Sequence, residues 1–104
     1  MSAPANPARG EAALLVGGEA VKLRPSFEAL VAAEEELGPL FALVERAAAG
    51  GLKLAEVAAL LWHCAEPREG LTRERIGAAI AELGLAGATP ALKALLGQIL
   101  RGTL

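Results

Sequence analysis

The sequence is short of the side chains that most enzymes use. It has no tyrosine and no aspartate, one histidine, one cysteine and two serines. A single cysteine excludes an internal disulfide and is typical of a reducing compartment. A structural zinc site needs four ligands, mostly Cys and His, so we predict no metal site. The two Gly-Gly pairs, Gly17-Gly18 and Gly50-Gly51, lack the lysine and the flanking pattern of a phosphate-binding loop. We therefore expect no cofactor and no catalytic residue.

The few reactive side chains have structural explanations. His63 and Cys64 are adjacent, so on a helix they diverge by about 100° and cannot readily share a metal. We expect Cys64 to be a small buried apolar residue with an inert thiol, and His63 to be exposed or at a rim. Ser26 is explained as a helix cap. The three consecutive glutamates, 34–36, span more than one face of a helix and so do not form a convergent carboxylate pair. We expect the aliphatic part of Glu34 to pack against the core while its carboxylate reaches the edge of the core.

Charge and hydropathy exclude two further classes of partner. The net charge is −2 and the ten basic residues are scattered, which predicts no nucleic-acid binding. Residues 1–10 contain no apolar stretch of a signal peptide. Residues 76–100 are largely apolar, but Glu82, Lys93, Gln98 and Pro90 interrupt them. We therefore expect no membrane segment and a cytoplasmic location.

Alanine and leucine dominate what the sequence does contain. They number 24 and 19 and supply most of the 54% hydrophobic residues, and the mean hydropathy is +0.44. Alanine buries little area, so the core of this single domain should be broad and thin. The remaining apolar surface suits a partner or a homo-oligomer.

The N-terminal part predicts a β-hairpin. Residues 1–10 are rich in proline and alanine and should be disordered, so the single domain is residues 11–104. Within residues 11–24, Gly17-Gly18 suits a two-residue turn that needs positive φ. The resulting register places Leu14 opposite Val21, and pairs Glu11 with Arg24 on the other face.

Residues 26–101 predict four to five short helices, which makes the fold α+β and mostly α. Pro25 stops the strand and Ser26 caps the first helix, which Gly38 ends. Pro39 should be the first residue of the second helix. A third helix follows from Leu54, and Thr72 should cap a fourth. The residues expected to face the core are, in the first helix, Phe27, Leu30, Val31 and Leu37; in the second, Leu40, Leu43 and Val44, with Phe41 nearby; in the third, Leu54, Val57, Ala58, Leu61 and Cys64; and in the fourth, Ile76, Ala79, Ile80 and Leu83.

The last helix is where we expect a partner to bind. Residues 84–88 are predicted to form a small-residue hinge, and residues 90–101 a helix with a continuous apolar stripe. The candidate partner-binding residues on it are Leu92, Leu95, Leu96 and Ile99, although the same stripe could equally complete the domain's own bundle. Trp62 lies off the core stripe of the third helix. It is either packed against the last helix or a fifth partner-binding residue.

The chain resembles a known family over about residues 10–80. The resemblance is carried by the Gly-Gly turn, by Leu23-Arg24-Pro25-Ser26-Phe27 with an acidic helix closing at Gly38, and by Leu71 to Gly77. These segments are similar to the small tail proteins of gene transfer agents, which are grouped with phage tail tube or tail assembly chaperone proteins.

The resemblance implies a non-enzymatic role in the assembly of a phage-tail-like particle. We expect a tail assembly chaperone that binds apolar helices of the tape measure protein, by a helix-in-groove mode. The alternative is a structural, tail tube-associated subunit that stays in the particle and meets other tail proteins through the edge of its hairpin. A small enzyme or metal-binding domain is the least favoured interpretation.

Overall fold

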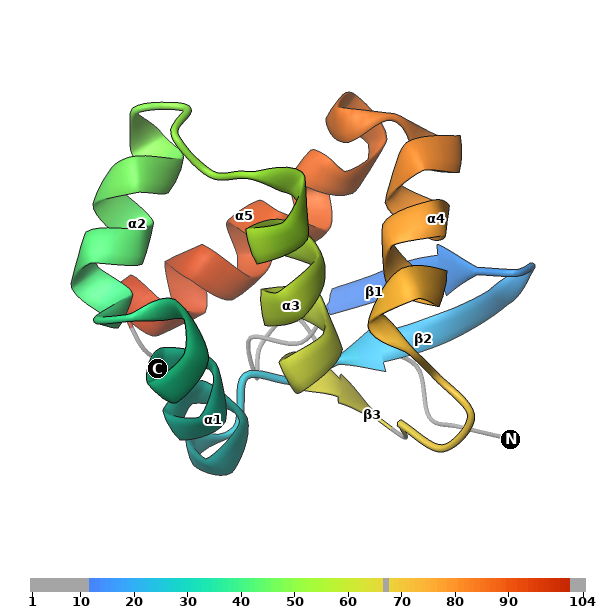
Figure 1. The fold of residues 1–104 in the computed structure, drawn as a ribbon, viewed down its shortest axis with the longest axis horizontal. Helices are drawn as coiled ribbons and strands as arrows, with labels where there is room; N and C mark the ends of the chain where they lie inside the picture. The colour runs from blue at the N-terminus through green and yellow to red at the C-terminus, as the bar shows by residue number, and fades with distance from the viewer. Residues whose placement is uncertain (1–11, 67, 102–104) are drawn as a thin grey trace.

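A computed structural model describes residues 12–66 and 68–101 (Figure 1). The predicted disordered tail, residues 1–10, and the predicted pairing of Glu11 lie outside them. Within the described ranges the fold is α+β and mostly α, as predicted. In chain order the elements are β1 (Ala12–Val16), β2 (Glu19–Leu23), α1 (Phe27–Leu37), α2 (Leu40–Ala48), α3 (Leu54–Cys64), β3 (Ala65–Glu66), α4 (Arg73–Leu83) and α5 (Leu85–Arg101).

The hairpin has the predicted register. Strands β1 and β2 are antiparallel, with Leu14 opposite Val21 and Ala12 opposite Leu23. The turn residues Gly17 and Gly18 have φ values of 59° and 85°, which L side chains rarely adopt. Leu14 and Leu23 are buried, so this face of the sheet faces the helices.

A third strand, which the sequence did not predict, completes the sheet. Strand β3 follows α3 directly and pairs antiparallel with β2, with Leu23 opposite Ala65. The amide of Arg24 also donates to the carbonyl of Cys64 at 2.7 Å. Two residues are too few to show an alternating pattern, so this strand is set by tertiary pairing alone.

Side-chain and glycine caps set the ends of α1 and the start of α2. Ser26 accepts a hydrogen bond from the amide of Ala29 at 3.2 Å, as predicted, and Gly38 ends α1 with φ of 90°. The Glu34 carboxylate accepts from the amide of Leu40 at 3.1 Å and so caps α2. Pro39 is the residue before α2 rather than its first residue.

Helix α3 is the centre of the fold. It lies between α1 and α4 and in front of α5 (Figure 1), and it contacts both α1 and α4. Its buried residues are Val57, Ala58, Ala59, Leu60, Leu61 and Cys64. The core of the described residues adds side chains from all three strands, from every other helix, and from Leu71 in the connection before α4.

Five side chains that we predicted on or beside the inward faces are exposed. They are Phe27 and Val31 on α1, Phe41 on α2, Leu54 on α3 and Leu83 on α4. Ala33 is the fully buried residue of α1. Leu30 and Leu37 pack against the core as partly buried residues, as predicted, so only Phe27 and Val31 turn outward. Leu54 and Leu83 lie in terminal turns, where a helix can leave its neighbour.

The predicted hinge at residues 84–88 is wrong. Gly84 ends α4 with φ of 80°, but α5 starts at Leu85 and runs without a break through Pro90. The single Gly87 costs a helix only about 1 kcal/mol relative to alanine, which is too little to stop it. Proline cannot donate to the carbonyl four residues earlier, and that carbonyl belongs to the exposed Ala86.

Candidate interaction surface

An apolar pocket lies between α2 and the end of α5. This α2/α5 pocket has a volume of about 180 Å³ and is lined by Leu40, Phe41, Val44, Ile99, Leu100 and the acidic Glu34. Phe41 is 76% exposed and Leu100 55% exposed. Two large apolar side chains therefore stand at the mouth of the pocket in contact with solvent.

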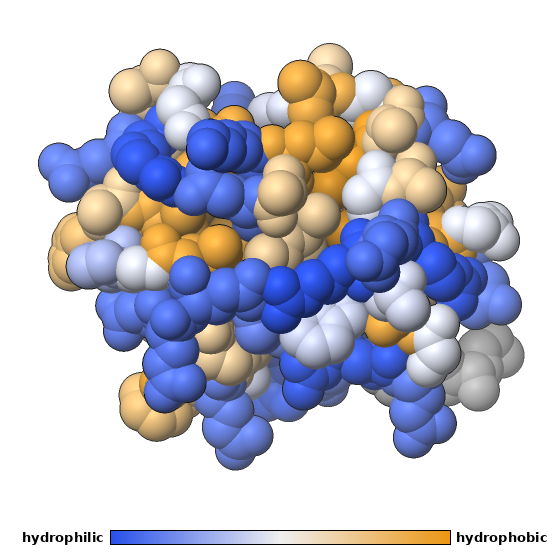
Figure 2. Space-filling view, in the orientation of Figure 1, coloured by the Kyte–Doolittle hydropathy of each residue, from blue (hydrophilic) through white to orange (hydrophobic). Residues whose placement is uncertain are grey.

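A second apolar pocket lies beside the start of α5. This α4/α5 pocket, of about 170 Å³, is lined mainly by Leu52, Val57, Ile80, Leu85 and Leu92. Leu85 is one of the large exposed apolar residues. On the face shown in Figure 2, hydrophobic surface appears in two places, between α3 and α4 and beside α2. Helix α5 thus lines an apolar pocket at each of its ends.

The structure separates the partner-binding residues that we predicted on the last helix. Ile99 borders the α2/α5 pocket and Leu92 borders the α4/α5 pocket. Leu96 is half-buried against the core, and Leu95 is fully buried within it. In this conformation Leu95 belongs to the core and presents no surface to a partner. Phe41, Leu85 and Leu100 were not among the predicted residues.

Trp62, the fifth candidate, is fixed by the connection between α3 and α4. Its indole Nε1 donates to the carbonyl of Leu71 at 3.0 Å. The guanidinium groups of Arg68 and Arg73 each lie 4.8 Å from the ring centroid, a distance at which cations attract an aromatic face. Trp62 therefore braces this connection, whereas we had predicted either packing against the last helix or contact with a partner.

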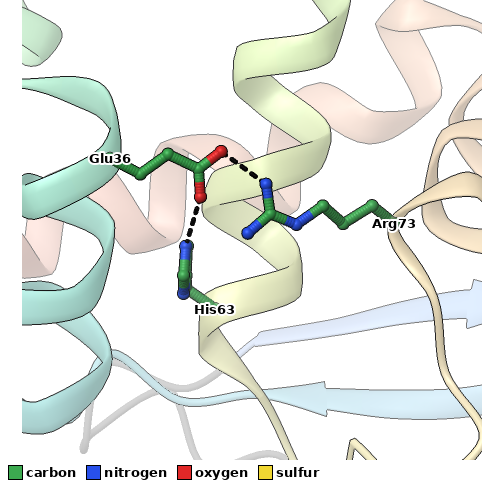
Figure 3. A network of polar contacts seen from close by, with 3 residues as sticks. All are labelled: Glu36, His63 and Arg73. Carbon is green, nitrogen blue, oxygen red and sulfur yellow. Dashed lines mark hydrogen bonds and ion pairs between the residues drawn. The ribbon is translucent and has the colours of Figure 1, made fainter.

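A polar cluster joins three helices next to Trp62 (Figure 3). The Glu36 carboxylate, from α1, lies 2.8 Å from Nε2 of His63 on α3 and also pairs with Arg73 of α4. The hydrogen bond from Arg73, and then that from His63, hold the pKa of the Glu36 carboxyl below its ordinary value. The same carboxylate raises the pKa of Arg73. The His63 side chain is at the rim but only 9% exposed.

No sequence signal pointed to this cluster. Glu36 and Arg73 are 37 positions apart, and neither belongs to a motif that requires the other. Glu34 and Glu36, in contrast, serve different partners on different faces of α1, as expected for a run that does not form a carboxylate pair.

A pocket of mixed charge brings Ser26, His63 and Cys64 together. It has a volume of about 250 Å³ and is also lined by two arginines and two glutamates. Nucleophilic catalysis needs a nucleophile bonded to its base. The Ser26 hydroxyl instead accepts from the Ala29 amide, and His63 Nε2 pairs with Glu36. Cys64 is buried, as predicted, and burial raises the pKa of its thiol to about 12, which disfavours the reactive thiolate.

The described residues, 12–66 and 68–101, contain neither a metal-binding cluster nor a membrane-spanning helix. In that part of the chain no three histidine, cysteine or acidic side chains are placed to hold a metal ion. None of its helices combines the length and hydrophobicity needed to cross a membrane.

Comparison with known proteins identifies the family of the chain. A family model described as "Phage tail tube protein, GTA-gp10" matches residues 9–102. This range contains all the described helices and strands and both apolar pockets. Neither the curated proteins nor the solved structures contain a match to the chain.

Proposed function

We propose, because the chain belongs to the GTA-gp10 phage tail tube protein family, that it is a structural subunit of a phage-tail-like particle. The observation that carries this proposal is the family match, which spans residues 9–102 of 104. In this role the protein works without catalysis and stays in the finished particle, in contact with further copies or with other tail proteins.

The surface of the domain supports an assembly role. Among residues 12–66 and 68–101, eight large apolar side chains are exposed, including both phenylalanines of the chain. Apolar side chains that line a surface pocket and contact solvent, as Phe41 and Leu100 do, are typical of protein–protein contact sites. The polar side chains that could support chemistry are used for capping and for holding helices together.

The sequence analysis favoured a different assembly role, a chaperone that binds the tape measure protein. The family match gives better support to the alternative from the sequence analysis, a subunit that stays in the particle. The reason is that the description of the family names the tail tube protein. Both roles need apolar contact surface. They differ in whether the protein is found in finished particles.

Mass spectrometry of purified particles tests the proposal. The gene is deleted in the cell that carries it and replaced by a tagged copy, and intact tails are isolated and their proteins quantified. A structural subunit is recovered in many copies per tail, at a fixed ratio to the other tail proteins. Recovery from the cell lysate with none in the purified tails would refute the proposal and favour a chaperone.

A further inference from the structure

Among the residues that the structure describes, Phe27 is the large apolar residue with the greatest exposure, at 81%. It is the first residue of α1 and is held in a rigid setting, since it follows Pro25 and since Ser26 caps the helix. Seven of the described core residues are alanine, so the core does not lack positions for a larger side chain. A phenyl ring in solvent beside an alanine-rich core indicates a contact outside the domain.

The α2/α5 pocket has the size and chemistry to receive such a ring. Its volume of about 180 Å³ exceeds the roughly 150 Å³ of an apolar cavity that binds benzene. Five of its six lining side chains are apolar, and the exposed Phe41 ring at its mouth can pack edge-to-face on a second aromatic ring. The α4/α5 pocket has no aromatic residue in its lining.

Phe27 cannot enter the α2/α5 pocket of its own chain. Helix α1 has 11 residues, so about 15 Å separates its first and last residues. Phe27 is at its first turn, whereas Glu34 and Leu40 place the pocket at its other end. The ring and the pocket can therefore meet only between two molecules.

We propose that Phe27 of one copy inserts into the α2/α5 pocket of a second copy. The two surfaces of this contact are different, so the interface is head-to-tail and each copy keeps a free ring and a free pocket. Such an interface continues into a closed ring or an open filament. The choice of a second copy as the partner rests on the proposed function, because a tube subunit meets further copies of itself.

Two single variants and their mixture test this contact. Phe27→Glu removes the ring and Leu100→Glu places a charge in the pocket. Leu15→Glu is the matched control. Leu15 is 55% exposed, the same fraction as Leu100, but it lies on the outer face of the hairpin. Self-association is measured by sedimentation velocity from micromolar to millimolar concentration, and folding by thermal melts.

We expect the unmodified protein and the Leu15→Glu variant to associate. The association constants of the Phe27→Glu and Leu100→Glu variants should each fall at least tenfold, while their melting temperatures stay unchanged. Burial of a phenylalanine is worth roughly tenfold to a hundredfold in an equilibrium constant. An equimolar mixture of Phe27→Glu and Leu100→Glu should form a 1:1 dimer, because one ring and one pocket remain intact between them.

Several results would overturn the contact. The first is an unmodified protein that stays monomeric at millimolar concentration. The second is a Phe27→Glu variant that associates normally while the Leu100→Glu variant does not, because another segment would then fill the pocket. Failure of the mixture to form a dimer would exclude the head-to-tail arrangement. Recovery of the protein from purified tails is measured separately, so the proposed function can survive the loss of this contact.

Discussion

Truncation of Leu95 tests whether α5 is part of the folded domain. Leu95 lies in the middle of this 17-residue helix and is fully buried. Helix α5 contacts β1, α2 and α4, so it closes the core against both the sheet and the bundle. If these contacts hold in solution, Leu95→Ala should leave a cavity that several elements share.

The expected loss is large for a domain of this size. A buried Leu→Ala substitution costs about 2–5 kcal/mol, because the apolar transfer energy is lost and the cavity relaxes only in part. Small domains have a total stability of about 5–15 kcal/mol. For about 100 residues, 1 kcal/mol corresponds to roughly 4–8 °C in Tm, so a loss of 3 kcal/mol lowers Tm by about 12–24 °C.

Urea denaturation, followed by far-UV circular dichroism, measures the effect. Leu100→Ala is the control, because it makes the same chemical change on the same helix at a residue that is 55% exposed, and it should cost less than about 1 kcal/mol. Equal unfolding free energies for the two variants would refute the reasoning. They would mean that α5 is not docked on its own domain in solution.

Three further predictions concern caps, thiol reactivity and pH. Ser26→Ala should lower the unfolding free energy by about 1 kcal/mol through loss of the α1 cap, and an unchanged urea midpoint would contradict the cap. Cys64 should react with a thiol reagent at pH 8 far more slowly in the native protein than in urea, because burial raises its pKa to about 12; equal rates would show that it is accessible. Arg73 and His63 lower the pKa of Glu36 from its ordinary value of 4.5. The ionised carboxylate therefore stabilises the fold above pH 4.5, by at most about 1 kcal/mol for a partly exposed pair. This stabilisation is lost as the pH falls through the folded-state pKa. The advantage of the unmodified protein over Glu36→Gln, followed by thermal melts from pH 7 to pH 3, should therefore shrink with acid, and an advantage that grows would exclude this pairing.

The sequence predicted the parts of the fold that depend on near neighbours. The turn at Gly17-Gly18, the caps at Ser26 and Thr72, and the helix end at Gly38 are all as predicted. In each case the interaction joins residues within about four positions, so the chemistry of a short segment is sufficient to specify it.

The sequence did not predict features that depend on distant residues. Strand β3 exists because Leu23 pairs with Ala65, and the Glu36 cluster exists because three helices meet. The opposite error occurred at residues 84–88, where small residues indicated a hinge and tertiary packing produced a helix. Local propensity is weak compared with the docking of α5 on β1 and α4.

The size of an apolar side chain also failed to predict its burial, and this failure bears on function. Helical spacing placed Phe27 on the core face of α1, yet the buried residue there is Ala33. Seven of the nineteen buried core residues are alanine, whereas both phenylalanines are more than 75% exposed. An isolated domain under selection for stability alone gains from the reverse arrangement, because a buried phenylalanine removes far more apolar area from water than a buried alanine. Helices packed through alanine lie close together and leave their large side chains outside, where these become buried only when a second molecule covers them. The thin core and the apolar surface are thus two consequences of one packing arrangement, which suits a protein that completes its burial by assembly.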